Sequence, residues 1–134
     1  EFTFDYFIKA LNRKPKTKIK TLLMLQDLIA GIGNIYSDEI LFKARVLPTR
    51  PVNDLTEKEL KAIYRAIRPV LALAIKHGGT SLKDYRKLDG SQGNYLHFAN
   101  VYHRAGQLCK VCKTPIKRII INGRSAHFCP NCQK

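Results

Sequence analysis

Cys109-Lys110-Val111-Cys112 and Cys129-Pro130-Asn131-Cys132 contain all four cysteines of the chain. A C-x-x-C turn directs two thiolates to one point, and two such turns supply the four ligands of a tetrahedral Zn²⁺ site. The alternative is a pair of disulfides in a secreted protein, but disulfide-rich domains usually distribute their cysteines over the whole fold. The spacing therefore predicts one structural zinc ion, bound by Cys109, Cys112, Cys129 and Cys132.

The segment between the two cysteine pairs has the pattern of a β-hairpin. Residues 117–121 are rich in β-branched side chains, Asn122-Gly123 is a preferred two-residue turn, and residues 125–128 return to the second pair. Arg124 is then expected beside the hairpin tip, exposed and at a fixed height above the metal. His103 and His127 are further potential ligands, but four thiolates already complete a structural site, which favours His127 as an ordinary strand residue.

The preceding residues predict helices. Apolar residues at helical spacing indicate a first helix over 1–12 with Thr3 as its cap, and a second over about 18–29. Asn34 is expected to cap a third helix over residues 35–44.

A fourth helix begins at Thr56, which forms a capping box with Glu59, and ends at Gly78-Gly79. Pro69 predicts a kink or a break in this helix. Residues 80–94 read as a loop, and residues 95–104 as a region with a short helix or strand.

Two features of the helical part suit an anionic partner. Lys14, Lys16, Lys18 and Lys20 form a basic run, for which a solvated face and a phosphate contact are both open readings. The glycines of Gly31-Ile32-Gly33-Asn34 allow a sharp turn into a helix N-terminus, where free N–H groups bind anions. Taken alone, such a turn is most simply a connection between helices.

The composition narrows the class of partner. Lys and Arg number 24 against 10 Asp and Glu, which gives a formal charge of +14 over 134 residues. This excess indicates a nucleic acid, and because the basic residues are spread along the chain it favours nucleic acid over a membrane surface. The sequence contains no run of about 18 apolar residues, so it predicts no membrane span.

Three features occur in order: the basic run with Gly31-Ile32-Gly33-Asn34-Ile35-Tyr36, the Gly78-Gly79-Thr80-Ser81 corner, and the four-cysteine hairpin with Asn122-Gly123-Arg124. Together they resemble the C-terminal half of the formamidopyrimidine-DNA glycosylase family, bacterial enzymes that remove oxidised purines such as 8-oxoguanine. The resemblance covers nearly the whole chain. It implies a mostly α fold, a helical bundle with a helix-two-turn-helix motif followed by a small four-cysteine zinc-finger β-hairpin.

The resemblance also implies roles for individual residues. Asn34 matches an asparagine that binds the DNA phosphate at the lesion. Arg124 matches a finger arginine that grips phosphates and supports the late elimination step. The other implied DNA contacts are Lys16, Lys20, Gly33 and Tyr102, and the implied loop over the extruded base, about residues 80–95, includes Thr80, Ser81, Asn94 and Tyr95. Where the family often has glycine after Val-Tyr, this chain has His103.

On this reading residues 1–98 are the helix-two-turn-helix DNA-binding domain and residues 99–134 the zinc finger. The catalytic proline and glutamate of the family would precede Glu1, so the chain is expected to be a piece of a longer enzyme that binds DNA without catalysis. Its partners would be duplex DNA with an oxidised base or abasic site and the missing catalytic domain. A monomer in the bacterial cytoplasm, associated with the nucleoid, is expected.

Two other classes fit parts of the sequence. A zinc-ribbon protein of the ribosome or the transcription apparatus would explain the charge, the helices and the cysteines. It gives no reason for Asn34, the Gly78-Gly79 corner and Arg124 to occur together. A secreted disulfide protein explains still less.

Overall fold

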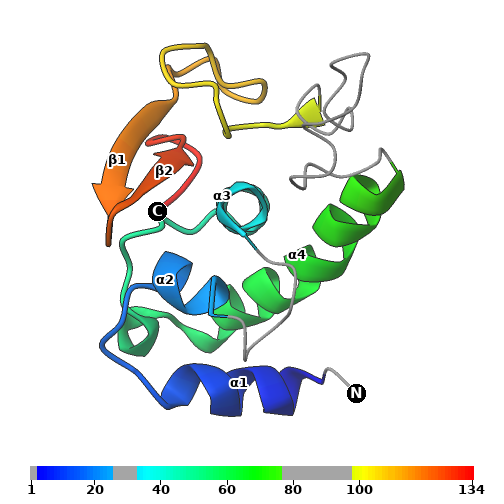
Figure 1. Ribbon diagram of the computed structural model, residues 1–134, viewed down its shortest axis with the longest axis vertical. Helices are drawn as coiled ribbons and strands as arrows, with labels where there is room; N and C mark the ends of the chain where they lie inside the picture. Colours follow the sequence, from blue (N-terminus) through cyan, green and yellow to red (C-terminus); the bar gives the residue numbers. More distant parts are fainter. Residues whose placement is uncertain (1–2, 26–32, 77–97) are drawn as a thin grey trace.

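The computed structural model describes residues 3–25, 33–76 and 98–134. Four helices precede a two-stranded hairpin: α1 (Phe4–Asn12), α2 (Ile19–Leu23), α3 (Asn34–Ala44), the 3-10 turn η1 (Val52–Asp54), α4 (Glu57–Lys76), β1 (Lys117–Ile121) and β2 (Arg124–Phe128). The prediction of a mostly helical fold with a small antiparallel hairpin is confirmed. In Figure 1, α3 lies in the middle, between the hairpin on one side and α1 and α2 on the other.

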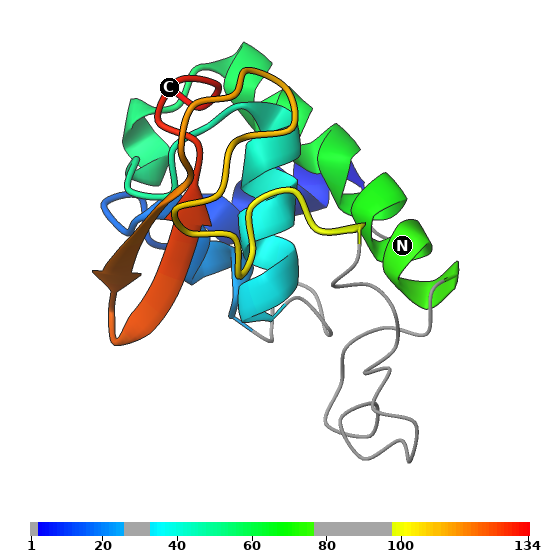
Figure 2. The ribbon, with the colours of Figure 1, turned by 90° about the horizontal axis from the view of Figure 1, so that it is seen from above.

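Two clusters of buried side chains meet at α3. Ile40 and Leu41 belong to the larger cluster, which joins α1, α2 and α4. The next residue, Phe42, belongs to the smaller cluster, which surrounds the cysteines and includes Val101 and Ile116. Because successive helical residues point about 100° apart, one short helix supplies both clusters, and Figure 2 shows α3 between α4 and the hairpin.

Several helix boundaries follow the predicted signals. Thr3 caps α1, since its Oγ1 accepts from the Tyr6 N–H at 3.1 Å. At the start of α4, the Thr56 N–H donates to Glu59 Oε1 at 2.9 Å, and the Glu59 N–H donates to Thr56 Oγ1 at 3.1 Å. The capping box predicted from the sequence is therefore confirmed.

Other boundaries differ from the prediction. α2 ends at Leu23, because the Met24 and Leu25 N–H groups reach carbonyls only three residues back and close the last turn; residues 26–29 of the predicted helix lie outside the described residues. Asn34 is the first residue of α3 and not its cap; Gly33 takes the cap position without any side-chain hydrogen bond. Gly33 has φ −109°, which any residue adopts, so this position does not require glycine.

Pro69 does not break α4, which is continuous from Glu57 to Lys76. Pro69 lies on the exposed side of the helix, where water can serve the carbonyl that loses its N–H partner. In residues 98–104, Phe98 has 3-10 helical structure and the others form bends and turns without a strand; residues 95–97 of the expected short helix or strand lie outside the described residues. Gly78-Gly79 and the loop at residues 80–95 lie outside the described residues.

Candidate metal centre and nucleic-acid interface

The four cysteines converge on one point. Their Sγ atoms all lie within 4.8 Å of one another, and three of the four residues are buried. The Sγ atoms of Cys109 and Cys132 are 3.8 Å apart, and those of Cys112 and Cys129 are 3.4 Å apart. Four sulfurs at about 2.3 Å from a tetrahedral zinc ion are separated by about 3.8 Å, so the spacing fits that metal.

The thiols differ in how readily they ionise, and a bound cation would favour the thiolate of each. Burial raises the pKa of Cys132 to about 12, whereas hydrogen bonds with Thr114 lower the pKa of Cys112 to about 5. Zinc binds thiolates. A divalent ion between the sulfurs supplies the charge that lets closely spaced thiols ionise together. Four thiolates would leave no ligand position open. The site is therefore structural and does not activate water.

The metal centre fixes a hairpin that rests on the helices. Asn122 and Gly123 have φ values of 49° and 80°, as the Asn-Gly turn predicts. Asn122 Nδ2 donates to Thr21 Oγ1 of α2 at 3.0 Å, so the turn contacts the helical part directly. Arg124 is exposed next to this turn, and its charge helps to lower the pKa of Lys20. The guanidinium of Arg124 therefore lies close to α2 and the start of α3.

Lys20 does not belong to an exposed basic face, as the basic run suggested. Only 1% of it is exposed, and its Nζ pairs with Asp38 and lies 3.2 Å from Ser37 Oγ and 3.5 Å from the Asn34 carbonyl. Burial lowers the pKa of Lys20, and Asp38 opposes that shift. Lys20 thus ties α2 to the first turn of α3, while Lys14, Lys16 and Lys18 are exposed as expected.

Asp38 also binds the hairpin. Its Oδ2 accepts from the His127 N–H at 2.9 Å and lies 2.9 Å from His127 Nδ1. His127 is buried and is not among the clustered metal ligands, which agrees with its reading as a strand residue. One carboxylate on α3 therefore connects α2 to β2 across the interior, and sequence reasoning did not single it out.

The neighbouring carboxylate holds the chain that leads into the finger. Glu39 is 2% exposed, and it accepts from the backbone N–H groups of Asn100, Val101 and Tyr102 at 2.7, 2.9 and 3.0 Å. Burial raises the pKa of Glu39, and these donors oppose the shift. Glu39 fixes where Tyr102 stands relative to α3.

Asn34 opens α3 beside these groups. Its Oδ1 is buried and has no hydrogen-bond partner in the described chain. Among the described residues, a Cβ added at Gly33 would meet nothing within 4 Å. A buried acceptor without a partner is costly, so Oδ1 would take a hydrogen-bond donor, whereas a phosphate oxygen could bind only at Asn34 Nδ2.

The structure thus brings together Asn34, Lys20, Tyr102 and Arg124 around the junction of α2, α3 and the hairpin. Lys16 lies apart from this set, exposed on the connection between α1 and α2. Thr80, Ser81, Asn94 and Tyr95 lie outside the described residues. In the part of the chain that the structure describes, no helix has the length and hydropathy to cross a membrane.

Two family models match the chain. Residues 1–86 match the model described as "Formamidopyrimidine-DNA glycosylase H2TH domain", and residues 106–134 match "Zinc finger found in FPG and IleRS". The second match identifies the four-cysteine cluster as a zinc-finger site, so the predicted structural zinc is confirmed.

Curated relatives and solved structures agree with these models. The formamidopyrimidine-DNA glycosylase of Crocosphaera subtropica is 48% identical over 132 residues, covering 98% of this chain and 46% of that protein. A crystal structure of the MutM (Fpg) protein from Thermus thermophilus superposes with a TM-score of 0.86 at 44% identity, covering 98% of this chain and 50% of that one. A complex of Lactococcus lactis Fpg with abasic-site DNA gives a TM-score of 0.86 at 37% identity, covering 99% of this chain and 48% of that one. The chain spans about half the length of the curated relatives it matches.

Proposed function

Since this chain belongs to the formamidopyrimidine-DNA glycosylase family, we propose that it is the damaged-DNA-binding portion of a base-excision-repair DNA glycosylase and AP lyase. The whole enzyme would remove oxidised purines such as 8-oxoguanine and formamidopyrimidines. The observation that carries this proposal is the position of Arg124, which the zinc hairpin holds close to Lys20 and so to the N-terminal end of α3.

This arrangement suggests a role for each segment in DNA binding. Helices α2 and α3 with residues 24–33 between them would be the helix-two-turn-helix motif of a domain over residues 1–98, and residues 99–134 would be the finger. Asn34, Gly33 and Tyr102 would contact the phosphate at the lesion, and Lys16 a phosphate farther along. Lys20 would not touch DNA itself but would support these contacts by holding the first turn of α3. Thr80, Ser81, Asn94 and Tyr95 would close over the extruded base.

Extruding a damaged base costs a few kcal/mol, and firm contacts to the backbone on either side offset that cost. Arg124 and the Asn34 end of α3 would provide such contacts without reading the sequence. Zinc supplies structural order to the hairpin when bound, and Arg124 supplies the charge that meets the phosphate. Arg124 would also support the late elimination step of the lyase reaction, whereas the main nucleophile would come from the missing catalytic domain.

Duplex DNA with an oxidised base or an abasic site would be the partner, bound by a monomer in the bacterial cytoplasm at the nucleoid. The supporting observations are the charge of +14 and the solved relatives bound to abasic-site and Fapy-dG DNA. A zinc-ribbon protein of the ribosome or the transcription apparatus remains the alternative class. It leaves the match of residues 1–86 unexplained.

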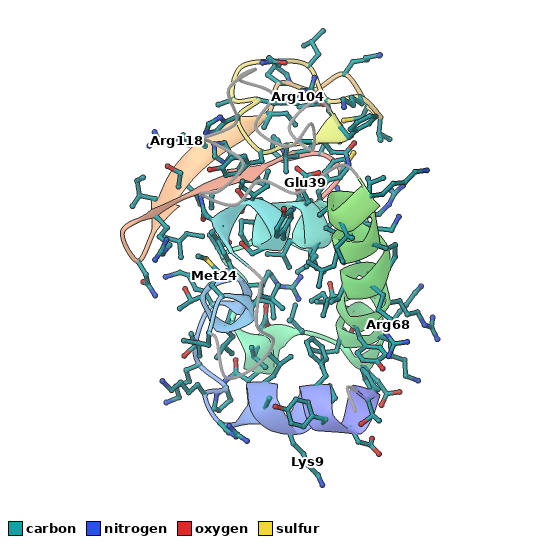
Figure 3. All side chains as sticks on the ribbon, turned by 45° about the vertical axis from the view of Figure 1, so that its right-hand side comes forward. Lys9, Met24, Glu39, Arg68, Arg104 and Arg118 are labelled. Carbon is teal, nitrogen blue, oxygen red and sulfur yellow. The ribbon has the colours of Figure 1, made fainter. Side chains whose placement is uncertain are left out.

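The decisive test is Arg124→Ala in binding to a duplex with a single abasic-site analogue. Loss of one phosphate contact should weaken binding roughly tenfold and lower the salt slope by about one unit. Arg68→Ala is the matched control, because Arg68 is an exposed arginine on α4 away from the hairpin (Figure 3). If the two variants bind alike, the finger does not grip DNA as proposed.

A further inference from the structure

A polar cavity separate from the hairpin tip lies between the hairpin, the first residue of α3 and the connection after Val101. Its volume is about 410 Å³. The lining residues include Asn34, Tyr102, His103, Arg118 and Ser125, whose side chains carry N–H or O–H groups, and His127, whose Nδ1 lies 2.9 Å from Asp38 Oδ2. Among the described residues no carboxylate lines it. Asp38, which contacts the lining residue His127, is buried and is already engaged by Lys20 and His127.

Arg118 provides the charge of this cavity. Its Nε donates to Ser125 Oγ at 2.9 Å, which aims the guanidinium along the hairpin face. In the described chain Arg118 forms no ion pair with an acid. Arg50, which has a structural role, differs from Arg118 in forming ion pairs with acidic residues. Arg50 binds Asp54, Glu59 and the Lys134 carbonyl.

Arg118 and Arg124 point to different places. The strand register pairs Arg118 with His127 and Ile121 with Arg124. Because side chains alternate along a strand, Arg118 shares the face of Ser125 and His127, and Arg124 lies on the other face. Figure 3 shows Arg118 projecting from the hairpin. The two arginines are therefore placed for two different anions.

His103 forms an exposed wall of the same cavity. It occupies the left-handed region at φ 61°, which costs a non-glycine residue energy. Its ring stacks on Tyr102 with centroids 4.4 Å apart and planes at 11°, and Tyr102 in turn meets the His127 ring edge-on at 4.9 Å. These three rings and Arg118 thus line the same cavity.

We propose that Arg118, with Ser125 and His103, forms a second backbone-phosphate subsite, which binds a phosphodiester group other than the one held by Arg124. This inference rests on the proposed function and extends its DNA contact surface. A phosphodiester suits the cavity because it carries one negative charge and only acceptor oxygens, which match the donors of a guanidinium, a hydroxyl and an imidazole. Asn34 lines the same cavity, so the phosphate that Asn34 contacts and the one at Arg118 would be neighbours.

The test compares Arg118→Ala with Lys117→Ala, a neighbour on the opposite face of the same strand that does not line the cavity. Each phosphate contact contributes about 0.9 to the slope of log K against log salt, which amounts to about eightfold in affinity near 0.1 M salt. Arg118→Ala should therefore bind an abasic-analogue duplex about eightfold more weakly than Lys117→Ala, with a slope lower by about 0.9. Arg118→Lys should recover part of the slope.

Duplexes with one neutral methylphosphonate at successive positions identify the phosphate. In Arg118→Ala, the methylphosphonate at one position should no longer weaken binding. That position should differ from the one that no longer weakens binding in Arg124→Ala. If Arg118→Ala matches Lys117→Ala while Arg124→Ala still weakens binding, the subsite is wrong and the proposed function stands. If neither arginine matters, the proposed function fails as well. If inorganic phosphate shifts the NMR signals of His103 and Ser125 but no duplex position responds to Arg118→Ala, the ligand is free phosphate and not DNA.

Discussion

Asp38 and Glu39 are consecutive carboxylates on α3, and each reaches a different part of the molecule. Asp38 meets Lys20 and His127, which are 18 and 89 residues away in the chain. Glu39 meets the backbone around Val101. Burying a charge costs several kcal/mol unless its partners are well placed, so both acids need their partners in position. The same requirement makes them precise spacers between the helices and the finger.

Glu39→Gln should destabilise the fold by about 1–3 kcal/mol, although it removes a buried charge. The amide has one acceptor oxygen, and its NH₂ group would face backbone N–H donors from Asn100 to Tyr102. Urea unfolding of both proteins at matched zinc measures the difference. A neutral or stabilising effect would mean that the backbone donors from Asn100 to Tyr102 accommodate the amide as well as they accommodate the carboxyl group.

The pKa of Glu39 gives this comparison a pH dependence. Burial raises that pKa in the folded state above 4.5. Between 4.5 and the raised value, the folded protein binds more protons than the unfolded chain, so stability falls as pH rises through this window. The difference in unfolding free energy between the natural protein and Glu39→Gln should therefore be largest at the acidic end and level off above the folded pKa. The opposite slope would contradict the raised pKa.

At the scale of elements, the hairpin depends on the metal and the helices do not. A two-stranded sheet alone is marginal in water, and β1 and β2 are bounded by the cysteine pairs. Leu41, Ile63 and the other residues of the larger core cluster come from the helical part. The finger should therefore unfold without zinc while the helices remain.

Removal of zinc by a chelator, or Cys129→Ser, should abolish the hairpin amide signals in NMR spectra, because metal binding is coupled to folding. The helical circular dichroism should persist at 25 °C, with a lower Tm because the contacts of Asp38 and Glu39 with the finger are lost. Each kcal/mol lost corresponds to about 4 °C for a chain of this size. Restoring zinc after chelation is the control. A hairpin that stays folded without metal would overturn the structural role of zinc.

Elements set by short-range signals could be predicted from the sequence. The Asn122-Gly123 turn, the Thr56 capping box and the cysteine spacing each depend on residues a few positions apart, and the structure confirms all three. Features set by distant pairs could not be predicted. Lys20 looks like one member of an exposed run, and only its pairing with Asp38 through the folded chain buries it. The end of α2 is likewise decided by backbone hydrogen bonds and not by apolar spacing.

Over the whole molecule, contacts at the end of the chain join the finger to the helices. Gln133 Oε1 accepts from the Cys129 N–H at 2.8 Å, and its Nε2 donates to the Val46 carbonyl at 2.9 Å. Arg50 Nη1 donates to the Lys134 carbonyl at 2.9 Å. With the Asn122 contact to Thr21, the finger is attached at both ends. The proposed grip therefore depends on a surface composed of both parts.

That surface should bind abasic DNA without forming a covalent bond. A Schiff base requires a neutral amine that reaches the opened sugar, and Lys20, the described lysine whose pKa is lowered, is buried against Asp38. Borohydride added to the chain with an abasic-site duplex should trap no adduct on a denaturing gel, while a native gel of the same mixture shows the complex. A trapped adduct would contradict the division between binding and chemistry. Its persistence in Lys20→Met would assign the reaction to another amine, and its loss there would show that Lys20 leaves Asp38 to reach the sugar.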